Sequence, residues 1–213
     1  HQVEVRGFRI ELGAVEAAEA EITAGSVQPS GVLRLNVPVT FGLMHLAPLW
    51  PDFMQRYPQV TLDVSLADRV VDLVEEGFDL AVRIAQLSSS TLVSRQLATT
   101  RMVLCASPEY LRRRGQPQRP ADLARHRVLA YSLFHQGEHW AFDGPQGREV
   151  VKVSPVLRTN SGDTCRAAAL AHQGVILQPS FLVGEELRRG ELVEVLPGHR
   201  SGEMGIYAVY PSR

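Results

Sequence analysis

The 213-residue chain is poor in cysteine and has no long apolar run. Its two cysteines, Cys105 and Cys165, cannot make a disulfide framework, and such sparse use is typical of a reducing cytoplasm. No segment is long enough to span a bilayer, and the first residues lack the basic, apolar and cleavable series of an export signal. We therefore expect a cytoplasmic protein without a membrane partner.

An excess of positive charge is lacking as well. Lysine and arginine number 22 and aspartate and glutamate 23, so the formal net charge is −1. The chain by itself is therefore a poor candidate for binding nucleic acid. Hydrophobic residues make up 45% and charged residues 21%, which is typical of a globular protein with a sizeable core. One large domain and two small lobes both fit this composition.

No catalytic or metal-binding constellation is evident either. If Cys165 lies on a helix, His172 lies about 10 Å away by helical rise, too far for a nucleophile and its base. The segment from His135 to His139 fits an H-x-x-E-H zinc motif, but Gly137 and the strand-like flanks favour a loop. We expect no enzyme, no cofactor and no metal. Cys165 is predicted to be a small residue packed under a helix.

An apolar stripe marks the first part of the chain. From Gly7 to Thr23, four apolar residues recur at spacings of four, three and seven: Phe8, Leu12, Val15 and Ile22. This pattern predicts an amphipathic helix with a narrow apolar face. The face could pack on its own domain or pair with a second copy, and both interpretations stay open. Residues 26–31 have the composition of a linker.

After the linker, strand and helix patterns alternate. Strands are predicted at residues 32–38, 60–66 and 79–84, with helices at 43–57 and 68–76 between them. Pro48 and Pro51 interrupt the first helix, and Asp68 is a candidate cap for the second. Strands that alternate with helices form a parallel sheet through crossover connections. This part is the predicted first lobe.

The second half begins with a long β-like run at residues 92–106. Helix starts follow at Ser107 and Pro120, and further strands are predicted at residues 128–134, 140–142, 150–153, 156–159 and 175–179. Helices are expected after Ser161 and at residues 183–189. The last strand, at residues 203–211, has no obvious neighbour in this half. If it returns to the first lobe, the chain forms two α/β lobes joined by two crossing segments, with a cleft between them.

Four segments carry a family resemblance: Gly31 to Ile84, Leu92 to Gly115, Leu157 to Pro179, and IYAVYP at residues 206–211. In order and spacing they resemble the effector-binding half of LysR-type transcriptional regulators. The resemblance implies a bacterial transcription factor with an N-terminal winged helix-turn-helix, a dimerising linker helix, and a regulatory domain of the periplasmic-binding-protein type II fold with two Rossmann-like lobes. The winged-helix module and a helix after Tyr210 are missing from this chain.

The resemblance also divides the chain. Residues 1–25 correspond to the tail of the linker helix, residues 31–99 plus 196–213 to regulatory lobe I, and residues 100–195 to regulatory lobe II. DNA binding would belong to the parent protein, through the winged helix-turn-helix. The alternative is a solute-binding protein of a transporter, which would need an export signal and has no use for a striped helix before Gly31. A further alternative is a redox sensor that uses Cys105 and Cys165. Nothing in the sequence indicates that these two thiols are adjacent.

Two polar turns carry the predicted site. Thr40 and Phe41 follow the first strand, where the C-terminal ends of parallel strands open onto the cleft. Asn160 and Ser161 precede a helix whose first backbone N–H groups can hold a carboxylate or similar anion. Each turn also has a structural interpretation, because Thr40, Asn160 and Ser161 could do no more than cap helices.

By the resemblance, further residues line the effector cleft: Ser65, Ala67, Arg83, Ala106, Gln178 and Pro179. Arg83 is either a bidentate clamp on an acidic effector or one half of a salt bridge to Asp79 or Asp68. An aromatic wall of Tyr131, Phe134 and Trp140 is conceivable, although core packing is the favoured role for at least two of them.

The predicted function is small-molecule sensing. An effector, expected to carry a carboxylate or another acceptor-rich group, would bind between the lobes and favour one arrangement of them. The family resemblance implies that each lobe also packs against a neighbouring subunit of a homodimer or homotetramer. Residues 43–57, with Trp50 and Phe53, and residues 167–172 are the predicted shared surfaces.

Overall fold

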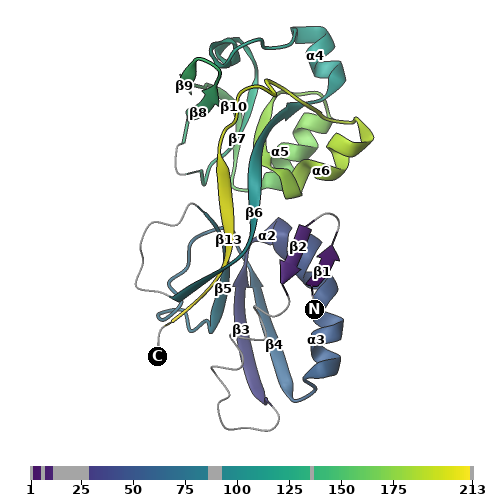
Figure 1. Ribbon diagram of the computed structural model, residues 1–213, viewed down its shortest axis with the longest axis vertical. Helices are drawn as coiled ribbons and strands as arrows, with labels where there is room; N and C mark the ends of the chain where they lie inside the picture. The colour runs from purple at the N-terminus through teal and green to yellow at the C-terminus, as the bar shows by residue number, and fades with distance from the viewer. Residues whose placement is uncertain (1, 6–7, 12–28, 86–92, 135–136, 212–213) are drawn as a thin grey trace. The chain divides into compact units, whose positions relative to one another are not determined.

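The computed structural model describes residues 2–5, 8–11, 29–85, 93–134 and 137–211 (Figure 1). The chain forms two compact units, one of residues up to Thr99 together with Met204 onward, the other of Thr100–Glu203. Within the described residues, no helix is long and apolar enough to cross a membrane.

A mixed sheet forms the first unit, with the order β6-β13-β5-β3-β4, in which β6 spans Val93–Ala106. Strand β3 (Gly31–Val37) runs parallel to β4 (Val60–Leu66) and β5 (Leu80–Ala85). Strand β13 (Glu203–Tyr210) pairs antiparallel with β5, from Gly205 opposite Ala85 to Val209 opposite Ala81. The structure thus confirms the parallel arrangement and the return of the last strand to the first unit.

The helical segment after β3 is broken into short pieces. Helix α2 (Val39–Phe41) leads into a π turn, η1 (Gly42–Leu46), a 3-10 turn, η2 (Ala47–Leu49), and helix α3 (Trp50–Arg56). The sequence pattern predicted one helix with interruptions at Pro48 and Pro51. Because proline lacks the N–H that an α-helical turn needs, the two prolines account for the change of helix type.

Residues 68–76 do not form the predicted helix. They form bends and turns, and the Asp72 carboxylate accepts hydrogen bonds from the N–H groups of Val74 (2.9 Å) and Glu75 (3.0 Å). Aspartate offers the backbone a local alternative to the helix in this way. Asp68 does cap a helix, but a different one, since its Oδ1 accepts from the N–H of Val39 at 2.9 Å.

The N-terminal prediction is wrong where the structure describes it. Strands β1 (Gln2–Val5) and β2 (Phe8–Glu11) pair as an antiparallel hairpin, whereas a helix was predicted from Gly7. Apolar and polar residues alternate in both segments, a period of two that favours strands. Residues 12–23 of the predicted helix lie outside the described residues.

The second unit is built on the other half of β6 (Val93–Ala106). Antiparallel to it run β11 (Ile176–Pro179) and β12 (Val193–Glu194). Strands β7 (Val128–Tyr131) and β10 (Pro155–Thr159) pair in parallel, and β8 (His139–Gly144) and β9 (Gly147–Lys152) form a hairpin. The helical elements are α4 (Pro108–Arg114), the 3-10 helix η3 (Pro120–Arg125), α5 (Gly162–Leu170) and α6 (Ser180–Arg189).

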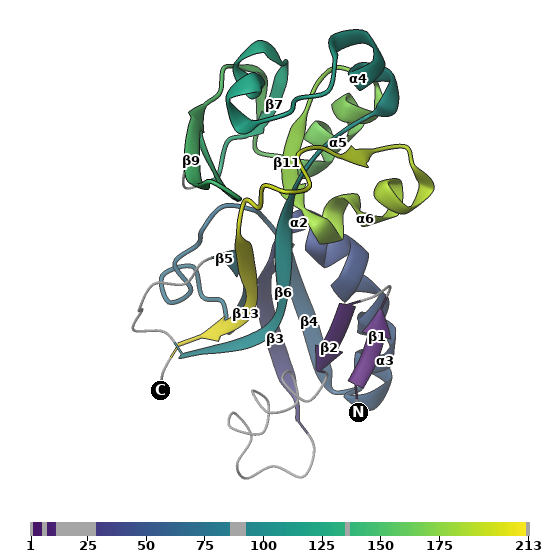
Figure 2. The same cartoon turned by 45° about the horizontal axis from the view of Figure 1, so that its top comes forward.

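Helices α5 and α6 both contact β11, as Figure 2 shows. The buried core of this unit includes Trp140, Phe142 and Val153. Residues 196–203, predicted as part of the first lobe, belong to the second unit. Asp143 and Arg200 exchange two backbone hydrogen bonds of 2.8 and 2.9 Å, and the Ser201 hydroxyl donates to the Ala141 carbonyl at 2.9 Å.

Candidate functional site

The first polar turn lies where β3 and β4 end and β5 begins. Asn36, only 1% exposed, stands opposite Ser65 on β4 and Ala81 on β5. Its Oδ1 accepts a hydrogen bond from Nη1 of Arg83 at 2.8 Å. Nη2 of Arg83 donates to the carbonyl of Val71 at 3.1 Å. The half-buried guanidinium therefore ties β5 to β3 and to the turn after β4.

Neither aspartate proposed as a partner pairs with Arg83. The Asp79 carboxylate instead accepts from the N–H of Arg34 at 2.8 Å, and Asp68 caps α2. Burial lowers the pKa of Arg83, an effect that the nearby Glu76 carboxylate opposes. Both terminal nitrogens are engaged in structural bonds, so the first role of Arg83 is to fix this turn.

Thr40 and Phe41 are buried in α2. Thr40 is a helical residue and does not occupy the cap position, which belongs to Pro38, so the alternative that it caps the helix does not hold. The ring of Phe41 lies 5.1 Å from that of His45. Ser65 on β4 and Ala67 just after it are half-buried, and the N–H of Ala67 donates to the Val37 carbonyl at 2.9 Å.

The second polar turn precedes α5. The Ser161 hydroxyl accepts from the N–H of Thr164 at 3.2 Å, and Oγ1 of Thr159 accepts from the N–H of Ser161 at 3.1 Å. Ser161 is thus the helix cap. Asn160 is exposed, and within the described part of the chain its side chain makes no hydrogen bond. The side chain of Asn160 is available to a ligand, whereas that of Ser161 serves the helix.

Beneath this turn lies the side chain of Gln178. It is 2% exposed, and its Nε2 makes no hydrogen bond with the described residues, although the amide lies close enough to the Cys165 thiol to oppose the rise in the pKa of that thiol. A Cβ built on Gly162, the first residue of α5, would lie 3.3 Å from its Oε1 and 2.5 Å from Cδ1 of Leu182. A larger residue there would require Leu182 to move. The unpaired amide of Gln178 therefore lies next to the start of α5.

The other predicted residues of this unit are mostly structural. Ala106 is fully buried and pairs with Val193, and Pro179 is buried at the start of α6. Trp140 belongs to the core, and Phe134 packs against it, which confirms core packing for two of the three aromatic residues. Tyr131 is half-buried, with its ring 5.1 Å from that of Phe134.

Both cysteines are free and fully buried. Burial raises the pKa of Cys105 to about 12 and that of Cys165 to about 11, which suppresses the reactive thiolate. His172 serves no cysteine, because its Nδ1 lies 2.8 Å from Oγ of Ser107. The prediction of Cys165 as a small residue packed under a helix is confirmed.

Asn36 is the site residue that sequence reasoning missed. It is a buried polar residue in the middle of an otherwise apolar strand end, Leu35 to Val37. Buried amides are hydrogen-bonded, so a lone asparagine there was a signal for a partner. The partner could not be named, because Arg83 is 47 positions away in the chain.

Comparison with known proteins decides the family. A family model described as the LysR substrate binding domain matches residues 26–213. The chain belongs to the LysR family of transcriptional regulators. It is an effector-binding regulatory domain of that family and not an enzyme. The alternative of a transporter's solute-binding protein is thereby set aside.

Several LysR-type relatives are named transcriptional regulators. An uncharacterized HTH-type transcriptional regulator of Haemophilus influenzae is 35% identical over 208 residues, which cover 98% of this chain and 71% of the relative. The HTH-type transcriptional activator TtdR of Escherichia coli is 33% identical over 89% of this chain and 61% of its own length. The chain thus spans only part of the relatives that it matches.

Solved LysR structures have the same fold. The regulatory domain of CrgA from Neisseria meningitidis is 32% identical, with a TM-score of 0.76 over 86% of this chain and 90% of that domain. The longer CrgA structure gives a TM-score of 0.79 at 33% identity, covering 93% of this chain and 67% of that one. The predicted two-lobed α/β fold class is confirmed.

Proposed function

We propose that this LysR-type domain senses a small molecule with a carboxylate or similar anionic group, held by the two polar turns. The observation that carries the proposal is the unpaired amide of Gln178, buried beside the first turn of α5. A buried donor without a partner costs about 1–3 kcal/mol, so a ligand acceptor that reaches Nε2 regains that free energy. Asn160 offers a further side chain at the same turn.

An anion also suits the start of α5. The first turn of a helix presents backbone N–H groups without intrahelical partners and the positive end of the helix dipole. Ser161 occupies only the N–H of Thr164. In the first unit, Ser65 is the half-buried hydroxyl closest in register to Asn36, and we propose it as a second contact. Thr40, Phe41 and Ala67 would shape that wall.

The test is a thermal-shift panel of small carboxylates, aromatic acids, amino acids and phosphorylated metabolites. Gln178→Met should leave the ligand-free melting temperature unchanged or raised, because it removes the orphan amide, and should abolish the shift that a compound produces. Asn160→Ala should leave the ligand-free protein unchanged and reduce the shift. Gln146→Met, at an exposed turn between β8 and β9, is the matched control and should leave the ligand-induced shift in melting temperature unchanged.

Two results would contradict the proposal. One is a compound whose shift survives both Gln178→Met and Asn160→Ala, since it then binds elsewhere. The other is a marked loss of stability in Gln178→Met without ligand, since Gln178 then has a structural role. Either result removes the second turn from the effector site.

Whole-protein properties follow as further proposals. The parent regulator would bind DNA through an N-terminal winged helix-turn-helix and act in the cytoplasm. LysR regulatory domains bind effectors and oligomerise. We place the subunit contacts of this chain, in a homodimer or homotetramer, at residues 43–57 and 167–172.

A further inference from the structure

A pocket lies at the far end of α5. It has a volume of about 290 Å³ and is lined by six residues: Tyr110, Arg113, Arg114, Arg127, His172 and Gln173. We call it the arginine pocket. Helix α5 separates it from the Ser161 cap by nine residues, or about 13 Å of helical rise. It therefore shares no residue with the proposed effector turn.

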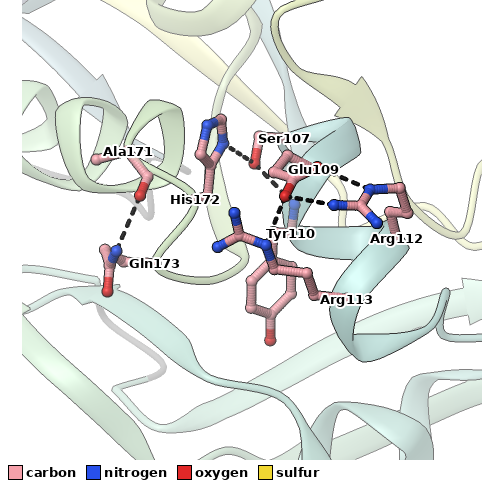
Figure 3. Close-up of polar contacts among 8 residues, drawn as sticks. All are labelled: Ser107, Glu109, Tyr110, Arg112, Arg113, Ala171, His172 and Gln173. Atoms are coloured by element: carbon pink, nitrogen blue, oxygen red, sulfur yellow. Dashed lines mark hydrogen bonds and ion pairs between the residues drawn. The ribbon is translucent and has the colours of Figure 1, made fainter.

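The lining of the arginine pocket holds three guanidinium groups and no acid. Arg113 has a counter-ion, Glu109, at 2.5 Å, which also binds Arg112 at 2.7 Å. Within the part of the chain that the structure describes, no carboxylate pairs with Arg114 or Arg127. Figure 3 shows the Arg113 guanidinium lying between Tyr110 and the loop that carries His172 and Gln173. The pocket is therefore cationic.

Arg127 is held in place at two points. Its backbone N–H donates to Oη of Tyr110 at 2.9 Å, and its Nε donates to the Gln173 carbonyl at 3.0 Å. Oη of Tyr110 also lies 3.1 Å from Nδ1 of His126. The terminal nitrogens of Arg127 have no partner among the described residues. An oriented guanidinium with free N–H groups loses less entropy on binding an anion.

His172 adds a donor to the same pocket. Oγ of the fully buried Ser107 accepts from the N–H of Tyr110 at 3.3 Å and lies 2.8 Å from Nδ1 of His172. When the Ser107 hydroxyl donates to Nδ1, the hydrogen of a neutral His172 ring is on Nε2. Like the arginines, the free edge of His172 then offers a donor.

We propose that the arginine pocket binds a small dianion, such as a phosphate group or a dicarboxylate. Every unused group of the arginines and of His172 is a donor, and guanidinium groups match the oxygens of phosphate and carboxylate. The volume is at the lower end of ligand pockets and suits a small metabolite. The net charge of −1 disfavours nucleic acid.

The neighbouring pocket is a poorer site for an anion. It has a volume of about 480 Å³ and shares His172, but Glu109 and Glu191 also line it. Those two carboxylates repel an anion. The dianion therefore belongs on the arginine side of His172, and its second charge distinguishes it from a ligand with a single carboxylate.

The experiment is calorimetric titration of the whole chain with inorganic phosphate and with succinate, against chloride at equal ionic strength. Arg114→Gln breaks no hydrogen bond or ion pair of the described residues, so it should fold normally and bind phosphate roughly fivefold more weakly. Arg114→Gln with Arg127→Gln should abolish binding. Arg125→Gln removes one exposed charge outside the pocket and should leave the affinity unchanged.

Four outcomes would overturn the proposal. Equal weakening in Arg114→Gln and Arg125→Gln would show a general charge effect without a site. Loss of phosphate binding in Asn160→Ala would place the anion at the effector turn. Phosphate and succinate that bind no better than chloride would leave the arginines as solvated surface charges. Tight binding of a DNA duplex, lost in Arg114→Gln, would replace the small dianion by nucleic acid.

Discussion

The contact between Asn36 and Arg83 fixes the end of β3 at the scale of single residues. Replacing Asn36 by alanine leaves the half-buried guanidinium with one of its two bonds, the one to the Val71 carbonyl. We expect Asn36→Ala to lower the free energy of unfolding by about 1–3 kcal/mol, because a charged donor loses its buried acceptor. Urea unfolding at pH 7 measures the loss.

Ser65→Ala is the matched control for that measurement. Ser65 stands opposite Asn36 in the sheet, but the Ser65 hydroxyl makes no hydrogen bond to any described residue. Removing the Ser65 hydroxyl should change the free energy of unfolding by less than about 0.5 kcal/mol. Equal effects of the two substitutions would show that the Arg83 contact contributes nothing beyond local packing.

The buried thiols predict how stability depends on alkaline pH. Burial raises the pKa of Cys105 to about 12 and that of Cys165 to about 11. A thiol with a raised folded pKa contributes stability that is complete below its unfolded pKa, about 8.5, and is lost as pH rises toward the folded value. Each thiol should therefore lower the free energy of unfolding by about 1.4 kcal/mol for every pH unit between pH 9 and the folded pKa of that thiol.

Urea unfolding at pH 8, 9 and 10 checks this slope. Cys105→Ala and Cys165→Ala should each lose about 1.4 kcal/mol less than the unchanged chain between pH 9 and pH 10. Lys152 is the only lysine and the tyrosines number five, and comparison with the variants cancels their titration. Identical slopes in all three proteins would mean that the thiols ionise freely in the folded state.

The sequence predicted the roles of some residues but not of others. The helix start at Ser107 depends on neighbouring residues, and it is confirmed, with Ser107 as the cap. The partners of Arg83 depend on which strands pair, so proximity in sequence to Asp79 pointed to the wrong contact. Local chemistry was predictable, and contacts between distant residues were not.

Arg166 joins two helices at the scale of elements. From α5 it donates to the Leu182 carbonyl at 3.1 Å and pairs with Glu186 of α6 at 3.4 Å, while Asp163 lies at 2.8 Å from its other nitrogen. Oε2 of Glu186 is buried without a hydrogen bond. Arg166→Met should lower the free energy of unfolding by about 3 kcal/mol, because a largely buried carboxylate loses its cation.

A double substitution distinguishes the contribution of the Arg166–Glu186 ion pair from the penalty for leaving one charge buried without a partner. Arg166→Met with Glu186→Leu should recover most of the lost stability, because replacing a buried ion pair by apolar side chains is often neutral. Urea unfolding of both variants makes the comparison. A double variant no more stable than Arg166→Met would show that the bond to the Leu182 carbonyl carries the effect.

Strands were predicted better than helices. The strand at residues 60–66 is confirmed to the residue, because alternation alone defines a half-buried strand. The helix predicted at residues 68–76 is a turn, since side chains such as Asp72 bind the backbone locally and override the apolar spacing. At residues 8–11 a four-residue alternation prevailed over a longer helical spacing.

At the scale of the whole molecule, the chain passes twice from one unit to the other. The sequence indicated this only because the last strand had no neighbour in the second half, and β13 indeed pairs with β5. An effector shifts such a molecule only by its difference in affinity between two states, and moving a population from 1:99 to 99:1 requires about 5.5 kcal/mol.

The proposed subunit surface at residues 43–57 leads to the last prediction. It exposes Leu43 (55%) and Met54 (50%). Burying such side chains between subunits contributes about 1.5–3 kcal/mol each, so a glutamate there should weaken association at least tenfold. We expect Leu43→Glu to shift the sedimentation profile toward monomer at micromolar concentration. Val70→Glu is the control, because Val70 is 84% exposed in the same unit but outside this surface. Dissociation by Val70→Glu with no effect of Leu43→Glu would move the interface to the turn after β4.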